Sequence, residues 1–329
     1  MSTTAVTPLR ALPAIGRRVR GYFAPVDRVH QQPTIFDPSA NGQFAADAPP
    51  APWVDLGWIE NFARKSASKF GGMVTGSPAT TQFQVRETVD ATVSFRFKAW
   101  SKLSMALAAG SEHMNLIVPA TGAAGNGSGS KGVAPVKLAA GSTATFLSLA
   151  ASDADGFAAG SLVTVDVDYA GQTGYVGSGV FAACVQSAAA VNSDPDYIRR
   201  VSFNVARVAS LATGATSGLV LAQPLIAGVP SSAMCVQPIC GFIDREGGSF
   251  FQEWSALFLI EGQQGERIFF HYPRLQSTVG SAESATAMTA PLERIALSAS
   301  FRALPVTDTN DGAAVVCFRS FLPSESTLV

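Results

Sequence analysis

The hydrophobic and polar residues alternate most regularly between Val89 and Lys98. A period of two is typical of a β-strand with one buried face and one solvated face. The pattern predicts a strand from Gln84 to Lys98, which would extend about 50 Å at roughly 3.3 Å per residue. Its predicted buried face is Val89, Ala91, Val93, Phe95 and Phe97, and its predicted polar face is Asp90, Thr92, Ser94, Arg96 and Lys98.

The period changes directly after Trp100. Leu103, Ala106 and Leu107 are spaced as i, i+3 and i+4, which predicts a short helix with a narrow apolar face. Ser101 is suited to cap its N-terminus and Gly110 to close its C-terminus. A helix this short, with such small residues, is able to lie on a sheet but not to form a core alone.

Shorter alternating runs predict further strands, and glycine-rich or proline-rich stretches predict the loops between them. The runs "VDLGWIENF", "SLVTVDVDYAG" and "RRVSFNVARV" are strand candidates, whereas "FGGMVTGSPATTQ" is a predicted loop. The stretch "FFQEWSALFLIEGQQGERIFFHYP" predicts two strands joined at "EGQQGE". Near the end, "ERIALSASFRALPV" and "AAVVCFRSFL" flank a predicted turn at "TDTNDG".

These patterns predict a mainly β fold, a sandwich or barrel with a short flanking helix and a small inserted β module. Residues 1–52 are expected to form an extended, proline-rich arm that orders only on a neighbour, because their periodicity is poor. Deleting the arm is then expected to leave a folded domain that assembles poorly. The main β domain is expected at 53–118 and 196–329, and the inserted module at 119–195.

Composition points away from some classes of protein. Of the 329 residues, 47% are hydrophobic and only 14% are charged, against a usual charged share of about 25%. A surface with so few charges is consistent with extensive contact with partners. The same composition is equally consistent with a well-buried enzyme. The net charge of -1 does not favour general binding to nucleic acid or to anionic membranes. No apolar run reaches the ~18–20 residues that span a bilayer, so no membrane partner is expected.

Candidate chemistry is sparse, so we predict no catalytic, cofactor-binding or metal-binding residues and no cofactor. The three histidines, His30, His113 and His271, are isolated, and no paired cysteines accompany them. "GAAGNGSGSKG" lacks the residue order of a phosphate-binding loop, and no nucleophile elbow is present. The pairs Asp153 with Asp155 and Asp166 with Asp168 leave a calcium or magnesium site open, although alternating Asp more often marks a solvated strand face.

Two stretches of the chain resemble a known family. "WVDLGWIENFARKSASK" followed by "QFQVRETVDATVSFRFKAWSKLSMALAAGS" is similar to the start of bacteriophage tail tube proteins, with the ending of the helix matched by Ala106, Leu107 and Gly110. "GERIFFHYPRLQ" and "ERIALSASFRALPVTDTNDGAAVVCFRSF" resemble the closing strands of that family. The resemblance covers about 53–118 and 240–325, roughly half of the chain.

The resemblance implies a structural virion protein and not an enzyme. Tail tube subunits resemble one another in having a β-sandwich with a flanking helix. They self-assemble into hexameric rings that stack into a tube. The implied partners are further copies of the chain, the tape-measure and other tail proteins, and DNA that passes through the lumen during ejection. The implied location is the virion tail, assembled in the host cytoplasm. Thr92, Ser94, Arg96 and Lys98 would face the lumen or a neighbouring subunit.

Two alternatives stay open at this point. One is another virion structural protein, such as a tail terminator or a decoration protein, which subunit stoichiometry would separate from a tube subunit. The other is a glycan-binding β module, which needs exposed aromatic residues with paired carboxylates on a concave face. The four tryptophans lie in apolar patterns, which disfavours the glycan-binding alternative.

Overall fold

The chain folds into two compact units. This computed structural model describes residues 16–27, 30, 32–118, 133–166, 197–214, 216–247, 252–263, 265–278, 282–284 and 296–324. The first unit, here called the barrel unit, comprises 1–26, 32–110 and 252–329, and the second, here called the insert unit, comprises 27–31 and 111–251. This division differs from the predicted one, because the insert begins directly after the short helix and continues well past residue 195.

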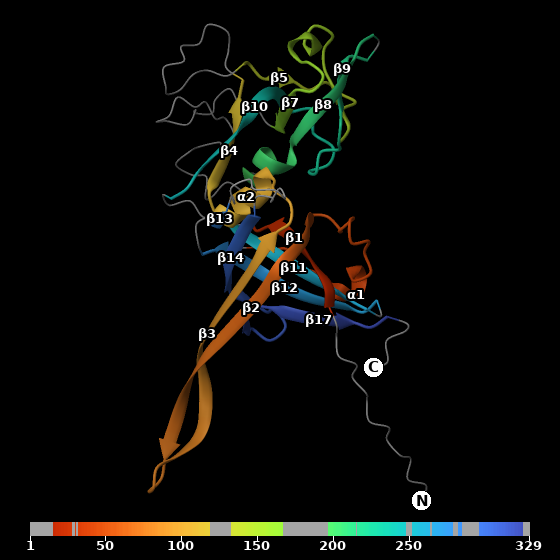
Figure 1. Cartoon of the computed structure of the whole chain (residues 1–329). Coiled ribbons are helices and arrows are strands. Elements are labelled where there is room, and N and C mark those ends of the chain that lie inside the picture. The colour runs from red at the N-terminus through yellow and green to blue at the C-terminus, as the bar shows by residue number, and fades with distance from the viewer. Residues whose placement is uncertain are drawn as a thin grey trace, which may run out of the picture. The chain divides into compact units, whose positions relative to one another are not determined.

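Six antiparallel strands of the barrel unit form a closed circuit (Figure 1). Their order is β14-β3-β2-β1-β11-β12, and β12 pairs with β14 to complete the ring. The mainly β fold predicted from the sequence is therefore confirmed. The strands are β1 (Gly16–Pro25), β2 (Val54–Thr75), β3 (Thr80–Phe97), β11 (Glu253–Gly262), β12 (Arg267–Ser277) and β14 (Ala296–Leu304).

Short elements complete the barrel unit. β13 (Ala282–Ser284) pairs with β14, and β17 (Phe318–Leu322) pairs with β12, so these two strands are the ends of the sheet order. β15 (Val306–Thr307) and β16 (Ala314–Val315) form a separate hairpin around the predicted "TDTNDG" turn. The expected hairpin between β11 and β12 is also present.

Aromatic side chains fill the inside of the barrel. The ring of Phe23 lies 5.5 Å from that of Phe301 and 6.1 Å from those of Phe95 and Phe258, centroid to centroid. Trp254 closes the group at 6.0 Å from Phe23. These strands expose alternate residues to the inside, so the apolar half of each alternation supplies the core.

The outer face of β1, β11 and β12 is apolar as well, and residues 32–53 cover it. Phe36 and Trp53 of this segment pack in one cluster with Tyr22, Leu257 and Phe269 of the barrel. The guanidinium Nη1 of Arg267 donates to the carbonyls of Gly42 and Phe44 at 3.0 and 2.7 Å, which ties the segment down. The segment includes the one-turn helix α1 (Pro38–Asn41), capped by Asp37.

The prediction that 1–52 is an arm without a core is therefore wrong for the described part of that range. β1 lies between β2 and β11 in the middle of the sheet, and Tyr22 and Phe23 are fully buried. Proline density misled the prediction, because Pro33, Pro38, Pro49, Pro50 and Pro52 lie in the covering segment, and β1 has a proline only at its last residue, Pro25. Deleting 1–52 would open the barrel, contrary to the expectation that a folded domain would remain.

The short helix is as predicted. α2 (Lys102–Ala109) begins after Ser101, whose hydroxyl accepts from the Ser104 amide in a capping box, and it ends at Gly110 with a φ of 61°. A left-handed residue at this position favours glycine. α2 contacts β14 and β12, with Ala106 and Leu107 buried.

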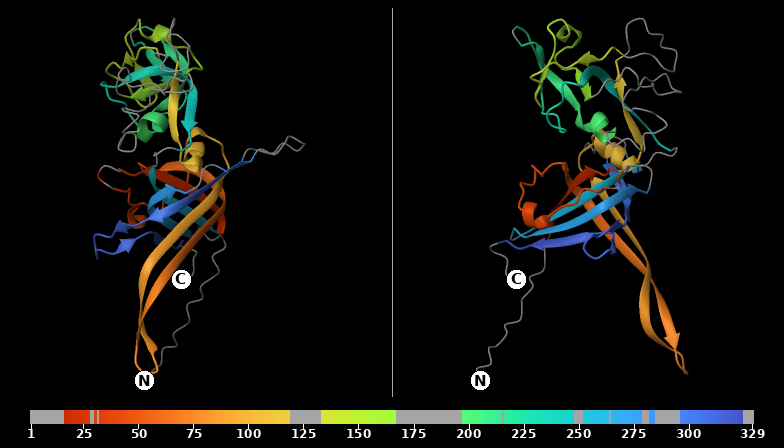
Figure 2. Two further views of the ribbon diagram at one scale, coloured as in Figure 1. Left: turned by 90° about the vertical axis from the view of Figure 1, so that its left-hand side faces the viewer. Right: turned by 180° about the vertical axis from the view of Figure 1, so that it is seen from behind.

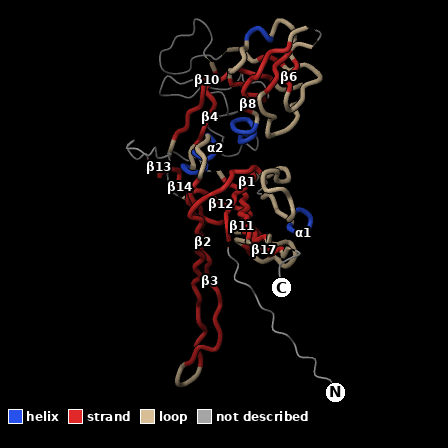
Figure 3. The backbone as a smooth tube through the Cα atoms, turned by 45° about the vertical axis from the view of Figure 1, so that its right-hand side comes forward, coloured by secondary structure: helices blue, strands red, loops and turns tan. Residues whose placement is uncertain are grey.

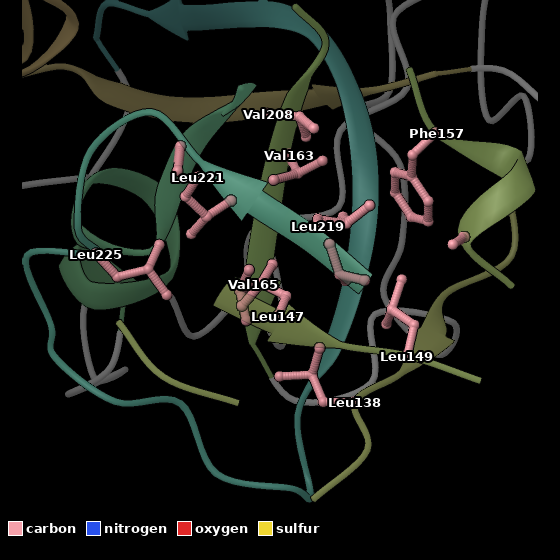
Figure 4. Packing of buried hydrophobic residues seen from close by; sticks show 13 residues of the cluster. Leu138, Leu147, Leu149, Phe157, Val163, Val165, Val208, Leu219, Leu221 and Leu225 are labelled. Atoms are coloured by element: carbon pink, nitrogen blue, oxygen red, sulfur yellow. The ribbon is translucent and has the colours of Figure 1, made fainter. Parts of the chain in front are cut away.

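The insert unit has a second β-sheet with its own core. The strand order is β4-β10-β7-β8-β9-β6, with β5 beside β10. Leu147, Val163, Val165, Leu219 and Val236 are all fully buried in this core, most of which Figure 4 shows from close by. The strands are β4 (Glu112–Ile117), β5 (Val136–Lys137), β6 (Phe146–Ser148), β7 (Leu162–Asp166), β8 (Val205–Ala212), β9 (Gly218–Leu221) and β10 (Cys235–Arg245).

Two local predictions were wrong. The first half of "RRVSFNVARV" is a π-helix, Arg199–Phe203, and the strand begins only at Val205. The apparent alternation there reflects the buried Val201 and Phe203 of the helix. The predicted loop "FGGMVTGSPATTQ" instead forms the ends of β2 and β3 around a turn at 76–79. Cross-strand pairing with β3 holds Gly71 and Gly72 in the strand.

A buried ion pair links β7 to the π-helix. The carboxylate of Asp166 is completely buried, and its Oδ2 lies 2.8 Å from Nη1 of Arg199. The carbonyl oxygen of Arg200 also accepts from the side chains of Asn115 and Thr164, each at 3.4 Å. Desolvated charges require such partners, so the pair fixes the helix against the sheet.

Removing one partner of this pair is expected to destabilise the insert unit. Asp166→Asn removes the charge of the carboxylate that Arg199 contacts, and the free energy of unfolding should fall by roughly 1–3 kcal/mol. Urea denaturation followed by circular dichroism measures this change. Asp155→Asn, at an exposed position of the same unit, is the matched control and should change stability by less than about 0.5 kcal/mol. Equal effects of the two substitutions would contradict the structural role of the pair.

His271 makes the covering segment sensitive to acid. Its Nε2 lies 3.2 Å from the carbonyl oxygen of Thr34, and its ring packs on Trp53 and Phe318. Burial lowers the pKa of His271 from 6.5 to about 4. The unfolded chain therefore binds the proton more readily than the folded chain between these two pH values.

Stability from this group is complete above pH 6.5 and is lost as pH falls from 6.5 to about 4. We expect the free energy of unfolding of the barrel unit to fall by about 3 kcal/mol over that range. Denaturation at a series of pH values measures it. His271→Phe should flatten that part of the profile, whereas His30→Phe at an exposed position should leave it intact. A profile unchanged by His271→Phe would show that the acid sensitivity arises elsewhere.

Candidate assembly surface

β2 and β3 continue together well beyond the barrel. β1 pairs with β2 only as far as Ile59, and β14 pairs with β3 only from Thr92 onward. Residues 66–75 of β2 and 80–91 of β3 therefore pair only with each other among the described residues. We call residues 66–90 the distal hairpin. All the views show it projecting from the barrel as a twisted two-stranded ribbon (Figures 1, 2 and 3).

One face of the distal hairpin is apolar. β3 buries Ala91, Val93, Phe95 and Phe97 inside the barrel, and Val89 continues this face further out. The register shift at Glu87 then turns Val85 and Phe83 to the opposite face of the strand. Phe83 and Val85 are 56% and 57% exposed. Across the ribbon, Met73 pairs with Phe83 and lies on the face of Phe83 and Val85, whereas the adjacent Val74 points to the other face. We call Met73, Phe83 and Val85 the apolar stripe.

Polar interactions hold the distal hairpin together. On the same face as the stripe, Glu87 forms an ion pair with Lys69 at 3.0 Å. On the opposite face the guanidinium of Arg86 lies 5.7 Å from the centre of the Phe70 ring, in a cation–π contact. The turn uses Gly76 at a φ of 97°, a conformation that L-residues rarely adopt.

The base of the hairpin is anchored to the barrel. β2 is bulged at Asn61, which has a φ of 53°, and the bulge turns Phe62 inward to lie 4.8 Å from the ring of Phe258. Arg64 then donates from Nε to the hydroxyl of Tyr272 at 3.0 Å. Burial raises the pKa of Tyr272 to about 12, so the hydroxyl keeps its proton. These contacts set the direction in which the ribbon leaves the barrel.

The residues predicted to face a lumen or neighbour lie on the outer face of β3. Thr92, Ser94 and Arg96 are half-buried and alternate with the buried core residues. Lys98 follows the strand, is exposed, and pairs with Glu60 of β2 at 3.2 Å. The neighbouring strand β14 places Arg302, Ser300 and Ser298 opposite Thr92, Ser94 and Arg96 on this face.

The groups considered for catalysis or metal binding lie apart. His113 is buried in the insert unit against Ser202 and Tyr197, His271 belongs to the barrel unit, and His30 contacts Asp27. Asp166 is engaged with Arg199, and Asp168 lies outside the described residues. Within the described ranges, no group of three or more His, Cys, Asp or Glu side chains is arranged to hold a metal ion.

Sequence reasoning missed the hairpin tip. A signal for it exists, because Phe83 and Val85 continue the sequence alternation of Val89 to Phe97, although the bulge at Glu87 places them on the other face of the strand. The glycines at 71, 72 and 76 outweighed it in the prediction, although only Gly76 lies in the turn.

A scan against protein-family models finds no match for this chain, and a search of curated proteins finds none either. In the part of the chain that the structure describes, no helix has both the length and the apolar composition needed to cross a bilayer. The geometry of the hairpin and of the polar face is therefore the basis for considering function.

The apolar stripe is expected to contribute little to the stability of the isolated subunit. Phe83→Ala should change the free energy of unfolding by less than about 0.5 kcal/mol, because the ring is already half exposed. Phe95→Ala, in the barrel part of the same strand, should cost about 3–5 kcal/mol, because that ring is buried among four other aromatic rings. Urea denaturation of the dilute, unassembled chain measures both. A large cost at Phe83 would mean that the stripe packs within the subunit.

Proposed function

We propose that this chain is a structural subunit of a phage tail tube, which self-assembles into stacked rings around a channel. The observation that carries the proposal is the amphipathic distal hairpin. A two-stranded ribbon is marginally stable in water on its own, so an apolar face along it favours a partner that covers it. The resemblance of the opening and closing strands to tail tube proteins supports the same class of protein.

A second copy of the chain is the proposed occupant of the apolar stripe. Its three side chains, each a little over half exposed, present on the order of 300 Å² of apolar surface. A stable protein–protein interface buries about 800 Å² on each partner, so the stripe supplies roughly a third of one. The remainder has to come from other surfaces, as in a lattice where each subunit touches several neighbours.

Open sheet edges offer a further contact. β13 and β17 end the sheet order, and an edge strand presents unpaired backbone groups that readily accept another strand. Phe321 on β17 is 47% exposed. Pairing between the β17 edge of one copy and an edge of the next would extend the sheet around a ring, for which the resemblance implies six subunits. The low share of charged residues, 14%, suits such coverage.

Assembly of the purified chain tests the proposal. We expect negative-stain microscopy of the concentrated protein to show rings or tubes. The double variant Phe83→Ser, Val85→Ser should remain monomeric, because it removes the apolar surface while the fold is kept. The matched control Thr81→Ser, Gln84→Ser alters the opposite face of the same strand and should assemble normally.

Three results would count against the proposal. A chain that stays monomeric at high concentration would contradict the proposal of a tail tube subunit. Normal tubes from the Phe83→Ser, Val85→Ser variant would contradict the role of the apolar stripe in assembly. Single rings that never stack would favour a tail terminator, since that protein is present once per tail.

A further inference from the structure

A serine, a histidine and a tyrosine form a hydrogen-bonded chain in the insert unit. Nε2 of His113 lies 2.9 Å from the hydroxyl oxygen of Ser202, and the hydroxyl oxygen of Tyr197 lies 3.3 Å from Nδ1 of the same ring. His113 and Tyr197 are buried, whereas Ser202 is partly exposed. We call these three residues the serine–histidine cluster. A hydroxyl within hydrogen-bond reach of a base, with a third group on the base, is the arrangement that activates a serine.

β4 and the π-helix bring the cluster together. His113 and Asn115 lie two residues apart on β4 and therefore point to the same face of the sheet. The side chain of Asn115 donates to the carbonyl oxygen of Arg200 at 3.4 Å, so the π-helix packs on that face. A single turn of π-helix is rare in proteins and is frequently found at functional sites.

The hydrogen bonds of Tyr197 determine which nitrogen of His113 carries the proton. The tyrosine hydroxyl donates to the carbonyl oxygen of His113 at 2.5 Å, and this contact uses its single proton. Toward Nδ1 the tyrosine oxygen is therefore an acceptor, so Nδ1 carries the hydrogen. Nε2 of the neutral ring is then the acceptor nitrogen, and the hydroxyl of Ser202 donates to it. A histidine acts as a general base toward a serine in this tautomer.

A carboxylate stands beside the histidine on the neighbouring strand. Asp244 of β10 is in register with His113, and residues paired in this way point to the same side of a sheet. The side chain of Asp244 is half-buried. A negative charge at that position stabilises the positive charge that the ring acquires when it takes a proton.

We infer that Ser202 is a nucleophile toward esters of short acyl chains, with His113 as its general base and Tyr197 as a positioning residue. Short chains are specified because the neighbours Val201 and Phe203 are buried and Ser202 is only partly exposed. The inference does not depend on the proposed function, because every residue of the serine–histidine cluster belongs to the insert unit.

The reaction has two balanced steps. In the first, Oγ of Ser202 bonds to the carbonyl carbon of the ester while the hydroxyl proton moves to Nε2 of His113. The bond between that carbon and the alcohol oxygen then breaks, and the departing alkoxide takes the proton from Nε2. In the second step water attacks the acyl-serine by the same proton path, which releases the carboxylic acid and restores Ser202.

Labelling of the full chain with a fluorophosphonate probe tests the inference, because this probe phosphonylates activated serines with loss of fluoride. Mass spectrometry of the peptides should find the label at Ser202. Ser202→Ala should lose the label, and His113→Gln should slow labelling at least about 100-fold. The matched control Ser210→Ala alters an exposed serine of the same unit and should label at the unaltered rate. Hydrolysis of p-nitrophenyl acetate, a short acyl ester, should follow the same order.

Tyr197→Phe distinguishes positioning from packing, because it keeps the ring and removes only the hydroxyl. Proton–nitrogen correlation by NMR should show His113 with hydrogen on Nδ1 in the unaltered chain and on Nε2 in the variant. Labelling of Ser202 should slow at least about tenfold in the variant, because the wrong nitrogen then faces the serine. An unchanged tautomer would overturn the role of Tyr197.

Three results would overturn the inference: no labelling of the unaltered chain, labelling only at other serines, or undiminished labelling of folded His113→Gln. Circular dichroism and thermal unfolding establish whether each variant is folded. If His113→Gln does not fold, the comparison is between Ser202 in the native chain and in the urea-unfolded chain. A native rate at least about 100-fold higher supports the inference, and equal rates overturn it.

Discussion

The rest of the structure depends on the alternation along β3 from Val89 to Phe97. The barrel buries the apolar face of this run from Ala91 onward, and a bulge at Glu87 reverses the two faces of the strand beyond Val89. Closure of the six strands places Phe95 against Phe23, Phe258 and Phe301, where burial of large aromatic surface stabilises the fold. Beyond the bulge, Phe83 and Val85 lie on the other face of the strand and remain in solvent. One strand thus supplies both a part of the core and an exposed apolar surface.

The outer face of the barrel differs in polarity between two groups of strands. Over β1, β11 and β12 the outer face is apolar, and the chain covers it with its own residues 32–53 through Phe36 and Trp53. Over β2, β3 and β14 the outer face is polar, and no described segment of the barrel unit covers it with a comparable apolar cluster. Thr92, Ser94 and Ser300 place hydroxyl groups on this face.

Much of the fold is predictable from local sequence patterns. The segments whose structure depends on distant residues are not predictable in this way. The alternation of β3, the capped helix at Ser101 to Gly110 and the β11–β12 hairpin are all predictable, because each depends on neighbouring residues. β1 is not, because its fully buried position in the sheet comes from pairing with β11, more than two hundred residues away. The π-helix at Arg199–Phe203 is stabilised by Asp166 and other polar partners from distant strands. At the candidate surface, the polar residues Thr92, Ser94 and Arg96 were predictable from alternation, but the hairpin tip was hidden by its glycines.

Hydrogen–deuterium exchange of the distal hairpin tests the central claim most directly. In the dilute, unassembled chain, amides of residues 66–90 should exchange rapidly, because a two-stranded ribbon without a third strand opens readily. In the concentrated, assembled state the same amides should become protected by a second copy, while those of β1 and β11 should be protected in both states. Protection of the hairpin that is equally high in the dilute chain, or equally low after assembly, would contradict the account.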